Sequence, residues 1–293
     1  MAKAGKTFFF ATRWLNNSIY NDTVILYNFC RTIDDIADEA PITPKREQAL
    51  THVLEALNFD HISHPIVDPL RHILKRFPEI RRPLIALVVA CRGDTPTLHI
   101  EDEENLEHYA HGVAGNVGLL MYPLLGGKDP AGRTYAARLG IAMQYTNIAR
   151  DIIEDLTRGR VYLPSTWLAN SSKSLTIESF NAHEARIATA VTMLLERANH
   201  HYAYGLRGLS YLDSRNRFAI TVAARCYQAI GSRVLQNQKL SRSRAVVPLS
   251  QKLLLTAKIA LGWSPVCAPC STTTTTTTTP RLQNSNEPLA INE

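Results

Sequence analysis

The stretch Ala136-Ala-Arg-Leu-Gly-Ile-Ala-Met-Gln-Tyr-Thr-Asn-Ile148 indicates the fold class. Its positions 137, 141, 144, 145 and 148 are three or four residues apart or adjacent, so they fall on one stripe of a helix. Residues 186–206 and 217–235 show the same spacing, and no segment of residues 45–260 alternates apolar and polar residues for long. Proline and glycine clusters separate at least seven segments of helical length. The sequence therefore predicts an all-α protein.

The helical pattern ends near residue 264. Eight consecutive threonines, Thr272–Thr279, precede Pro280 and a polar remainder, and such a composition cannot bury enough apolar surface to offset the entropy of ordering. We therefore expect one domain over residues 1–264 and a disordered, threonine-rich tail over residues 265–293. Cys267 and Cys270 form a CxxC pair inside this tail, which is a weak signal for a metal site without a second pair.

The composition restricts the class of function. The chain has 293 residues, of which 45% are hydrophobic and 20% are charged, as in ordinary globular proteins. Its net charge of +6 includes no block of five or more Lys and Arg residues, so we expect no nucleic-acid partner. A modest basic excess suits anionic small substrates or an anionic membrane surface.

Cysteine usage and apolar runs indicate the compartment. Five cysteines form an odd, sparse set, which argues against a disulfide scaffold and for a reducing environment. No stretch approaches the roughly 20 apolar residues that a membrane span requires, and the run Phe8-Phe9-Phe10 is too short for a signal peptide. We expect a cytoplasmic protein, and a peripheral contact with a membrane stays open.

Acidic residues recur at helical spacing in the segment Tyr27-Asn-Phe-Cys-Arg-Thr-Ile-Asp-Asp-Ile-Ala-Asp38. Positions 27, 31, 34 and 38 share one helical face, which sets Asp34 and Asp38 one turn apart beside Arg31. A second column follows in residues 144–155, where two aspartates are again four residues apart. It comprises Gln144, Asn147, Asp151 and Asp155.

Apolar residues flank both columns, and carboxylates in such a setting are costly to bury unless they are paired or bind a metal ion. Taken singly, each column also fits a solvated helix face. Two columns of equal spacing instead favour facing helices that hold a cluster of hard cations. Carboxylate oxygens suit Mg²⁺, which bridges protein acids to substrate phosphates, and no His or Cys stands in register, which disfavours zinc. The sequence predicts a Mg²⁺–diphosphate site inside a helical bundle.

Four arginines near these columns, Arg31, Arg150, Arg158 and Arg160, carry forked guanidinium groups that suit diphosphate oxygens. A surface ion pair is the default interpretation for each, and above all for Arg150. No GxxxxGK[ST] motif is present, which excludes a P-loop nucleotide site.

Three glycines, Gly112, Gly115 and Gly118, recur every third residue. Glycine costs about 1 kcal/mol relative to alanine inside a helix, so the repeat predicts a close approach. A neighbouring helix is the favoured cause, and a long substrate chain is the alternative.

With these motifs the chain resembles the squalene/phytoene synthase family, the head-to-head isoprenoid synthases, from about Lys6 to Leu261. Residues 144–164, QYTNIARDIIEDLTRGRVYLP, resemble the family's second aspartate-rich motif and its RGRxYLP trailer. Residues 27–38 resemble the first motif, and residues 109–118 resemble the Tyr-Val-Ala-Gly helix with His111 where a tyrosine is common. Residues 6–8 resemble the N-terminal substrate-binding motif, although Gly5 stands where a serine is usual. Residues 227–230 and 243–248 resemble bacterial phytoene synthases in particular.

The resemblance implies a single-domain helical bundle of the isoprenoid-synthase fold with a central active-site cavity. It implies a prenyltransferase that joins two prenyl diphosphates 1′–1 through a cyclopropylcarbinyl diphosphate, with Mg²⁺ as cofactor and Mn²⁺ as a substitute. Geranylgeranyl diphosphate would then give phytoene for carotenoid biosynthesis. The expected partners are prenyl diphosphates, a bilayer that receives the apolar product, and downstream isoprenoid enzymes.

The resemblance also implies roles for individual residues. Metal ligands would be Asp34, Asp38, Asn147, Asp151 and Asp155; substrate would be bound by Thr7, Tyr27, Arg31, Arg150 and Arg158; and the catalytic residues lining the cavity would be Tyr109, Gln144 and Tyr227. These roles suit the chemistry, because an ionising allylic diphosphate needs its negative charge stabilised and a carbocation must be kept from water.

Several alternatives stay open. A squalene synthase would use farnesyl diphosphate and NADPH, whereas a dehydrosqualene or presqualene diphosphate synthase would use farnesyl diphosphate alone. Head-to-tail elongation is disfavoured because the second column contains Asp-Ile-Ile-Glu-Asp instead of DDxxD, and a terpene cyclase is disfavoured because its usual Asn/Ser/Glu site is lacking. A non-catalytic assembly factor on the same fold is a remote alternative, because it would be expected to have lost acids that this chain retains.

Overall fold

The protein contains helices and no β-strand in the part of the chain that the computed structural model describes, namely residues 6–38, 43–95, 98–169, 175–236 and 244–262. This confirms the all-α prediction. Short 3₁₀ or π-helical turns, labelled η, join several of the α-helices. In chain order the elements are α1 (Lys6–Thr12), α2 (Asn17–Ala37), α3 (Pro44–Asn58), η1 (Asp68–Leu70), α4 (Arg71–Arg76), η2 (Pro78–Ile80), α5 (Arg81–Gly93), α6 (Glu103–Ala110), η3 (His111–Gly115), α7 (Asn116–Leu124), α8 (Gly132–Thr157), α9 (Phe180–Leu206), η5 (Arg207–Tyr211), α10 (Ser214–Gln236) and α11 (Leu249–Ala260).

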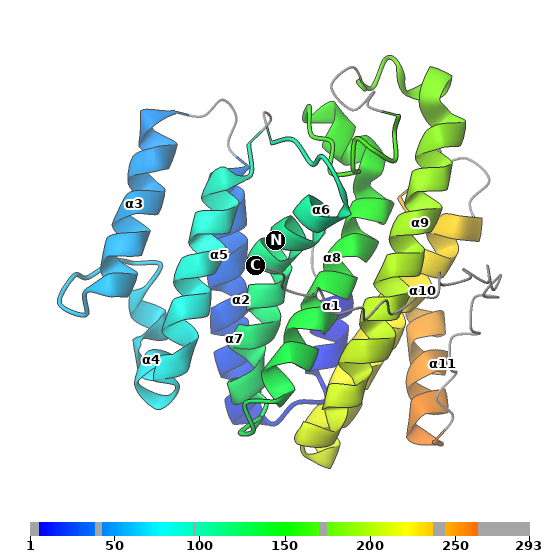
Figure 1. Ribbon diagram of the computed structural model, residues 1–293. Helices are drawn as coiled ribbons and strands as arrows, with labels where there is room; N and C mark the ends of the chain where they lie inside the picture. Colours follow the sequence, from blue (N-terminus) through cyan, green and yellow to red (C-terminus); the bar gives the residue numbers. More distant parts are fainter. Residues whose placement is uncertain (1–5, 39–42, 96–97, 170–174, 237–243, 263–293) are drawn as a thin grey trace, which may run out of the picture.

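Helix α8 lies at the centre of the bundle, where it packs against both α7 and α9 (Figure 1). The stripe predicted from the sequence is its buried side, because Ala137, Ile141, Tyr145 and Ile148 are all buried. Gln144, at the edge of this stripe, keeps part of its surface accessible. Helix α8 therefore has one side in the core and a polar column that water can reach.

Apolar side chains form two large clusters. One surrounds α8 and α9 and includes Tyr145 and Leu194. The other is built from α2, α3, α4, α5 and α7 and includes Ile33 and Leu84. The first acidic column belongs to α2 and the second to α8, so a site that uses both lies at the junction of the two clusters.

Backbone contacts hold η3 and α7 unusually close to α8. A Cβ on Gly118 would collide with the backbone carbonyl of Ala136 in α8, and one on Gly140 of α8 would collide with the carbonyl of Ala114. A Cβ on Gly112 would meet the Cβ of Ala90 in α5. The favoured interpretation of the glycine repeat, close packing of neighbouring helices, is confirmed. Residues 111–115 form a π-helical turn, so the glycines do not follow one regular α-helical face.

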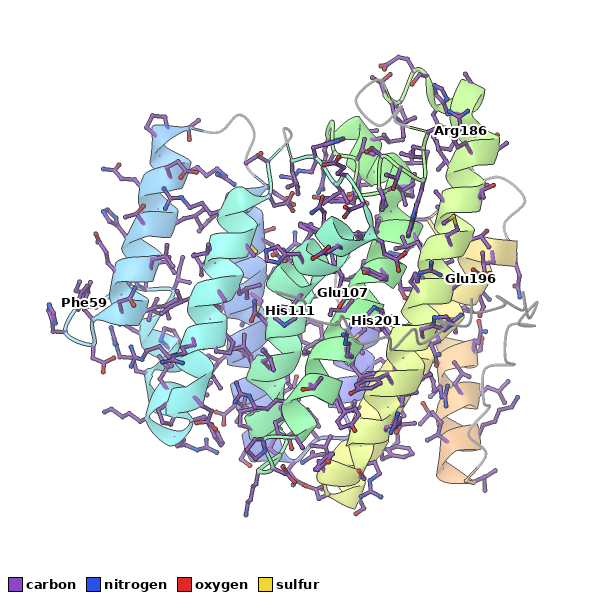
Figure 2. The ribbon with its side chains drawn as sticks, in the orientation of Figure 1. Phe59, Glu107, His111, Arg186, Glu196 and His201 are labelled. Carbon is purple, nitrogen blue, oxygen red and sulfur yellow. The ribbon has the colours of Figure 1, made fainter. Side chains whose placement is uncertain are left out.

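Ion pairs tie α6 to α8 and α9 on the other side of the bundle. Arg138 of α8 donates a hydrogen bond of 2.5 Å to Glu107 of α6. The Nε2 atom of His201 in α9 lies 3.6 Å from the same carboxylate, and Figure 2 shows Glu107 and His201 on these neighbouring helices. Burial lowers the pKa of His201, which is consistent with a neutral imidazole packed inside the bundle.

The C-terminal helices complete the fold. Helix α10 packs against α1, α8 and α11. Residues 265–293, with the CxxC pair and the threonine tract, lie outside the described residues, so the tail and the domain boundary stay predictions. No helix in the described ranges combines the length and apolar character needed to cross a bilayer.

Candidate active site

The first acidic column occupies the last turns of α2. Asp34 is exposed to solvent at the end of α2, but partial desolvation by neighbouring protein raises the pKa of its carboxyl to about 7. The Cys91 thiol of α5 donates to Asp34 over 3.6 Å. The Arg31 guanidinium hydrogen-bonds Asp35 at 2.5 Å, so in this structure Arg31 is turned toward its exposed i+4 neighbour and not toward the Asp34–Asp38 column.

The second column runs along α8. Asp151 accepts hydrogen bonds from two arginines: Arg150 at 2.8 and 2.5 Å, and Arg244, just before α11, at 2.7 and 3.0 Å. Burial alone would raise the pKa of Asp151, but these two guanidinium groups bring it below its ordinary value. Asp155 accepts no such hydrogen bond from a side chain of the described residues, and burial together with repulsion from Asp151 raises its pKa to about 8. The Arg150 side chain is only 17% exposed, so its pair with Asp151 is not a surface ion pair.

A capped turn after α8 joins the two columns. The backbone N–H of Arg160 donates to the carbonyl of Asp155 at 2.9 Å, and Gly159 adopts a φ of +71°. This is the Schellman arrangement, in which glycine ends a helix at low cost. The turn sends both flanking arginines toward α2, where Arg158 donates to Asp38 at 3.1 Å and Arg160 also hydrogen-bonds Asp38. The RGR sequence therefore connects the acids of α8 to those of α2.

Asp94, at the end of α5, lies between the columns. It accepts hydrogen bonds from the hydroxyl groups of Tyr109, at 2.8 Å, and Tyr162, at 2.9 Å. The two tyrosine rings stack with centroids 4.9 Å apart. Burial raises the pKa of Asp94, and its charge interacts with those of Asp38 and Asp155. The acids of α2, α5 and α8 therefore form one electrostatic cluster.

Other predicted residues lie around this cluster. The Tyr27 ring packs on Phe8 and Phe9 of α1, with centroids 5.0 and 4.8 Å away. Burial raises the pKa of Tyr227 in α10. The charges of Tyr27 and Asp151 also act on Tyr227, so it lies near both residues. Thr7 lies half-buried on α1 next to Phe8. The structure thus gathers Tyr27 and Tyr227, whereas the substrate role of Thr7 stays a prediction.

The polar groups of the columns fit a divalent cation. The side-chain oxygen of Asn147 is buried without a hydrogen-bond partner, while its amide nitrogen donates to Gln144 at 3.4 Å. Desolvation raises the pKa values of Asp34 and Asp155, and a nearby cation would lower them again. No three His, Cys, Asp or Glu side chains of the described residues converge on one point. The metal-ligand assignment therefore stays a prediction.

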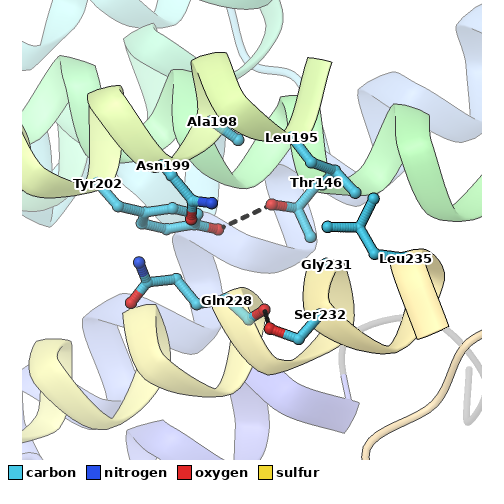
Figure 3. A pocket seen from close by; sticks show the side chains of 9 residues that line it. All are labelled: Thr146, Leu195, Ala198, Asn199, Tyr202, Gln228, Gly231, Ser232 and Leu235. Atoms are coloured by element: carbon cyan, nitrogen blue, oxygen red, sulfur yellow. Dashed lines mark hydrogen bonds between the residues drawn. The ribbon is translucent and has the colours of Figure 1, made fainter. Parts of the chain in front are cut away.

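A small recess lies between α8, α9 and α10 (Figure 3). Polar groups of Asn199, Gln228 and Ser232 line it, and Tyr202 and Thr146 share a hydrogen bond of 3.0 Å beside it. It contains none of the predicted site residues, so the expected central cavity stays a prediction.

Three residues of this cluster were not assigned a role from the sequence: Asp94, Tyr162 and Arg244. A signal existed for two of them, because Tyr162 belongs to the RGRVYLP segment and Arg244 to residues 243–248. Asp94 and Arg244 stand in connecting segments, where no helical spacing points to them.

Comparisons with known proteins agree with this geometry. The family model described as squalene/phytoene synthase matches residues 1–251. The 15-cis-phytoene synthase of Paracoccus sp. (strain N81106 / MBIC 01143) is 29% identical over 84% of this chain and 85% of its own length. The phytoene synthase of Pseudescherichia vulneris is 31% identical over 80% of both chains.

Among solved structures, a dehydrosqualene synthase in complex with ligand superposes with a TM-score of 0.76. It is 25% identical, and the match covers 89% of this chain and 92% of the other. The predicted isoprenoid-synthase fold and the resemblance drawn from the two acidic columns are both confirmed.

Proposed function

This chain belongs to the squalene/phytoene synthase family, and from that membership we propose that it joins two molecules of geranylgeranyl diphosphate head to head to form phytoene, a carotenoid precursor. The membership itself makes the chain a prenyltransferase that condenses prenyl diphosphates. The C20 substrate is favoured by the names of the two sequence relatives described above, both phytoene synthases.

One observation carries the proposed chemistry: the acid columns of α2 and α8 meet at Asp38, where Arg158 and Arg160 both hydrogen-bond one carboxylate. Arg158 is 48% exposed, so it can exchange Asp38 for an incoming diphosphate oxygen. Guanidinium groups bind such oxygens through two parallel hydrogen bonds. The first diphosphate would leave from this junction.

Divalent metal fits the same place. We propose that Asp34, Asp38, Asn147, Asp151 and Asp155 hold Mg²⁺, which when bound would neutralise the diphosphate and favour its departure as an anion. Arg244 and Arg150 hold Asp151 in its ionised form, the form that binds metal. The side-chain oxygen of Asn147, which is buried without a hydrogen-bond partner, would coordinate the metal ion.

The proposed reaction has two steps. Loss of the first diphosphate lets its C1 carbon add to the 2,3 double bond of the second molecule, and loss of a proton closes the ring of a cyclopropylcarbinyl diphosphate. Loss of the second diphosphate, rearrangement to the 1′–1 bond and loss of a second proton then give the hydrocarbon without a reductant. Tyr109 and Tyr162, stacked and held by Asp94, would place two aromatic rings against the cations. Aromatic faces attract cations, and the apolar surroundings exclude the water that would quench them.

A second candidate is dehydrosqualene synthesis from farnesyl diphosphate. The superposition on a dehydrosqualene synthase favours it, and the same site would perform it, because the two reactions differ in the length of the substrate chain. Downstream isoprenoid enzymes would consume either product.

Product analysis by mass spectrometry tests the proposal. Purified protein with Mg²⁺ receives geranylgeranyl or farnesyl diphosphate, each with and without NADPH. We expect a C40 hydrocarbon with a conjugated triene from the C20 substrate, formed without NADPH and abolished by a chelator. A C30 hydrocarbon without reductant would support the second candidate, and one formed only with NADPH would indicate squalene synthesis. Turnover that survives complete metal removal would overturn the Mg²⁺ assignment.

A further inference from the structure

Helix α11 packs Leu255 and Ile259 against the core but leaves a second set of leucines outside. Lys252 and Thr256 are buried, whereas Leu249, Leu253 and Leu254 are 60%, 53% and 56% exposed. Surface helices normally bury their apolar stripe. Leu261, just beyond the helix, is 86% exposed and extends the same surface.

The outward side is continuous. Positions 249, 253, 257 and 260 follow one another at three- and four-residue spacing, and positions 254 and 261 flank them. The opposite side packs inward, because α11 contacts α10 and the Lys252 ammonium lies 5.8 Å from the centre of the Phe10 ring in α1. Figure 1 shows α11 beside α10 at the edge of the bundle. We call the exposed set of leucines 249, 253, 254 and 261 the α11 face.

The charge of the surrounding sequence is strongly one-sided. Residues 214–262 contain nine Lys or Arg residues and no Asp or Glu. Because the whole chain has a net charge of only +6, the remainder of the chain is net negative. The positive excess therefore resides in the segment that forms α10 and α11.

We propose that the α11 face docks on the surface of a bilayer that contains anionic lipids. Leucines on one side of a helix insert into the boundary between headgroups and acyl chains, and nearby basic residues add attraction to anionic headgroups. A second copy of the chain is a poorer occupant, since the two copies of residues 214–262, each with nine basic residues and no acid, would repel each other. With 12 residues, α11 is about 18 Å long, so it lies on a bilayer and does not span its core of about 30 Å.

The α11 face lies close in sequence to the candidate active site. Arg244, which binds Asp151, precedes the start of α11 at Leu249 by five residues. Between them, Ala245 and Val247 are buried while Val246 is 58% exposed. If the chain consumes prenyl diphosphates and releases a hydrocarbon, docking here would let the substrates enter from the bilayer and the product return to it. That benefit depends on the proposed function, whereas the docking itself does not.

Vesicle sedimentation of the full chain tests this proposal. Vesicles contain phosphatidylcholine alone or phosphatidylcholine with phosphatidylglycerol. We expect binding to the anionic vesicles to be at least about tenfold stronger and to weaken as salt is added. The triple variant L249Q/L253Q/L254Q should lose about tenfold or more of this binding. The control is F59Q/V89Q, because Phe59 and Val89 are 54% and 53% exposed elsewhere in the fold; it should bind as the parent protein does.

Turnover separates docking from catalysis. With substrate dispersed in detergent, the triple variant should retain the parent's turnover, because none of its sites touches the acid cluster. Equal vesicle binding by the parent and the triple variant would overturn the proposal, as would equal binding to neutral and anionic vesicles. If the parent protein is a dimer, the triple variant is a monomer and neither binds vesicles, the α11 face is an interface between copies and the proposal is overturned. Absence of turnover with vesicle binding intact would count against the proposed function alone.

Discussion

Arg158, in the turn after α8, donates a 3.1 Å hydrogen bond to Asp38 at the end of α2, across 120 positions of sequence. The two side chains are 48% and 32% exposed. Ion pairs at this exposure contribute about 0–1 kcal/mol to stability. The contact is therefore too weak to be needed for folding, and Arg158 is free to exchange its partner for an anionic ligand.

The substitution Arg158→Gln should separate activity from stability. We expect turnover to fall by about 100-fold or more, as when a group that stabilises developing charge is removed, while the free energy of unfolding changes by less than about 1 kcal/mol. Steady-state kinetics and urea unfolding measure the two effects. The matched control is Arg197→Gln, since the Arg197–Glu103 pair is similarly exposed on α9 and α6. Turnover of Arg158→Gln within threefold of the parent would contradict its substrate role.

The substitution Tyr162→Phe should slow turnover without loosening the fold. It removes the 2.9 Å hydrogen bonds to Asp94 but keeps the ring stacked on Tyr109. We expect kcat to fall about 10–100-fold, with KM nearly unchanged, because the pair would act on the cationic stages and not on binding. Tyr122→Phe is the control: its buried hydroxyl donates to the carbonyl of Asp129, before the start of α8, so it should affect stability only. A change confined to KM would rule out this positioning role.

Most of the helical pattern was predictable because its physical cause is local. The buried stripe of α8 and the two acidic columns follow from spacings of three and four residues, which depend on helix geometry alone. The partner of Arg31 was not predictable, since Asp34 and Asp35 are both within reach one turn away; the structure selects Asp35.

Contacts between segments far apart in the sequence could not be predicted from helical spacing. Asp94, Tyr109 and Tyr162 come from three segments that share no spacing, and only the packing of α5, α6 and the turn after α8 brings them together. Arg244 reaches Asp151 across 93 positions from a connecting segment. The π-helical turn at residues 111–115 likewise depends on the close approach of α8, which the sequence indicated only through its glycines.

The substitution Asp155→Asn should stabilise the protein while inactivating it. Burial and Asp151 raise the pKa of Asp155 to about 8, far above its unfolded value of about 4. Between these pH values the folded state binds a proton that the unfolded state does not, so stability falls as the pH rises through this range. The variant should escape this loss and, at pH 8 without metal, gain at least about 1 kcal/mol.

Thermal unfolding at pH 6 and pH 8, with and without Mg²⁺, measures this effect. The parent should gain more stability from Mg²⁺ than the variant does, because ligands that bind the native state raise its stability. Glu154→Gln is the control, since Glu154 is exposed and lies one position away. An equal response of both proteins to Mg²⁺ would remove Asp155 from the proposed ligands.

Two glycine-to-alanine substitutions should have opposite effects on stability. A Cβ at position 118 meets the backbone carbonyl of Ala136, which cannot move without shifting α8, so Gly118→Ala should destabilise by about 2 kcal/mol or more. A Cβ at position 93 meets nothing within 4 Å. Gly93→Ala should therefore be neutral or stabilise by up to about 1 kcal/mol, because it reduces the freedom of the unfolded chain. Urea unfolding of both variants measures the difference, and an unchanged midpoint for Gly118→Ala would mean that α7 and α8 are not held in backbone contact.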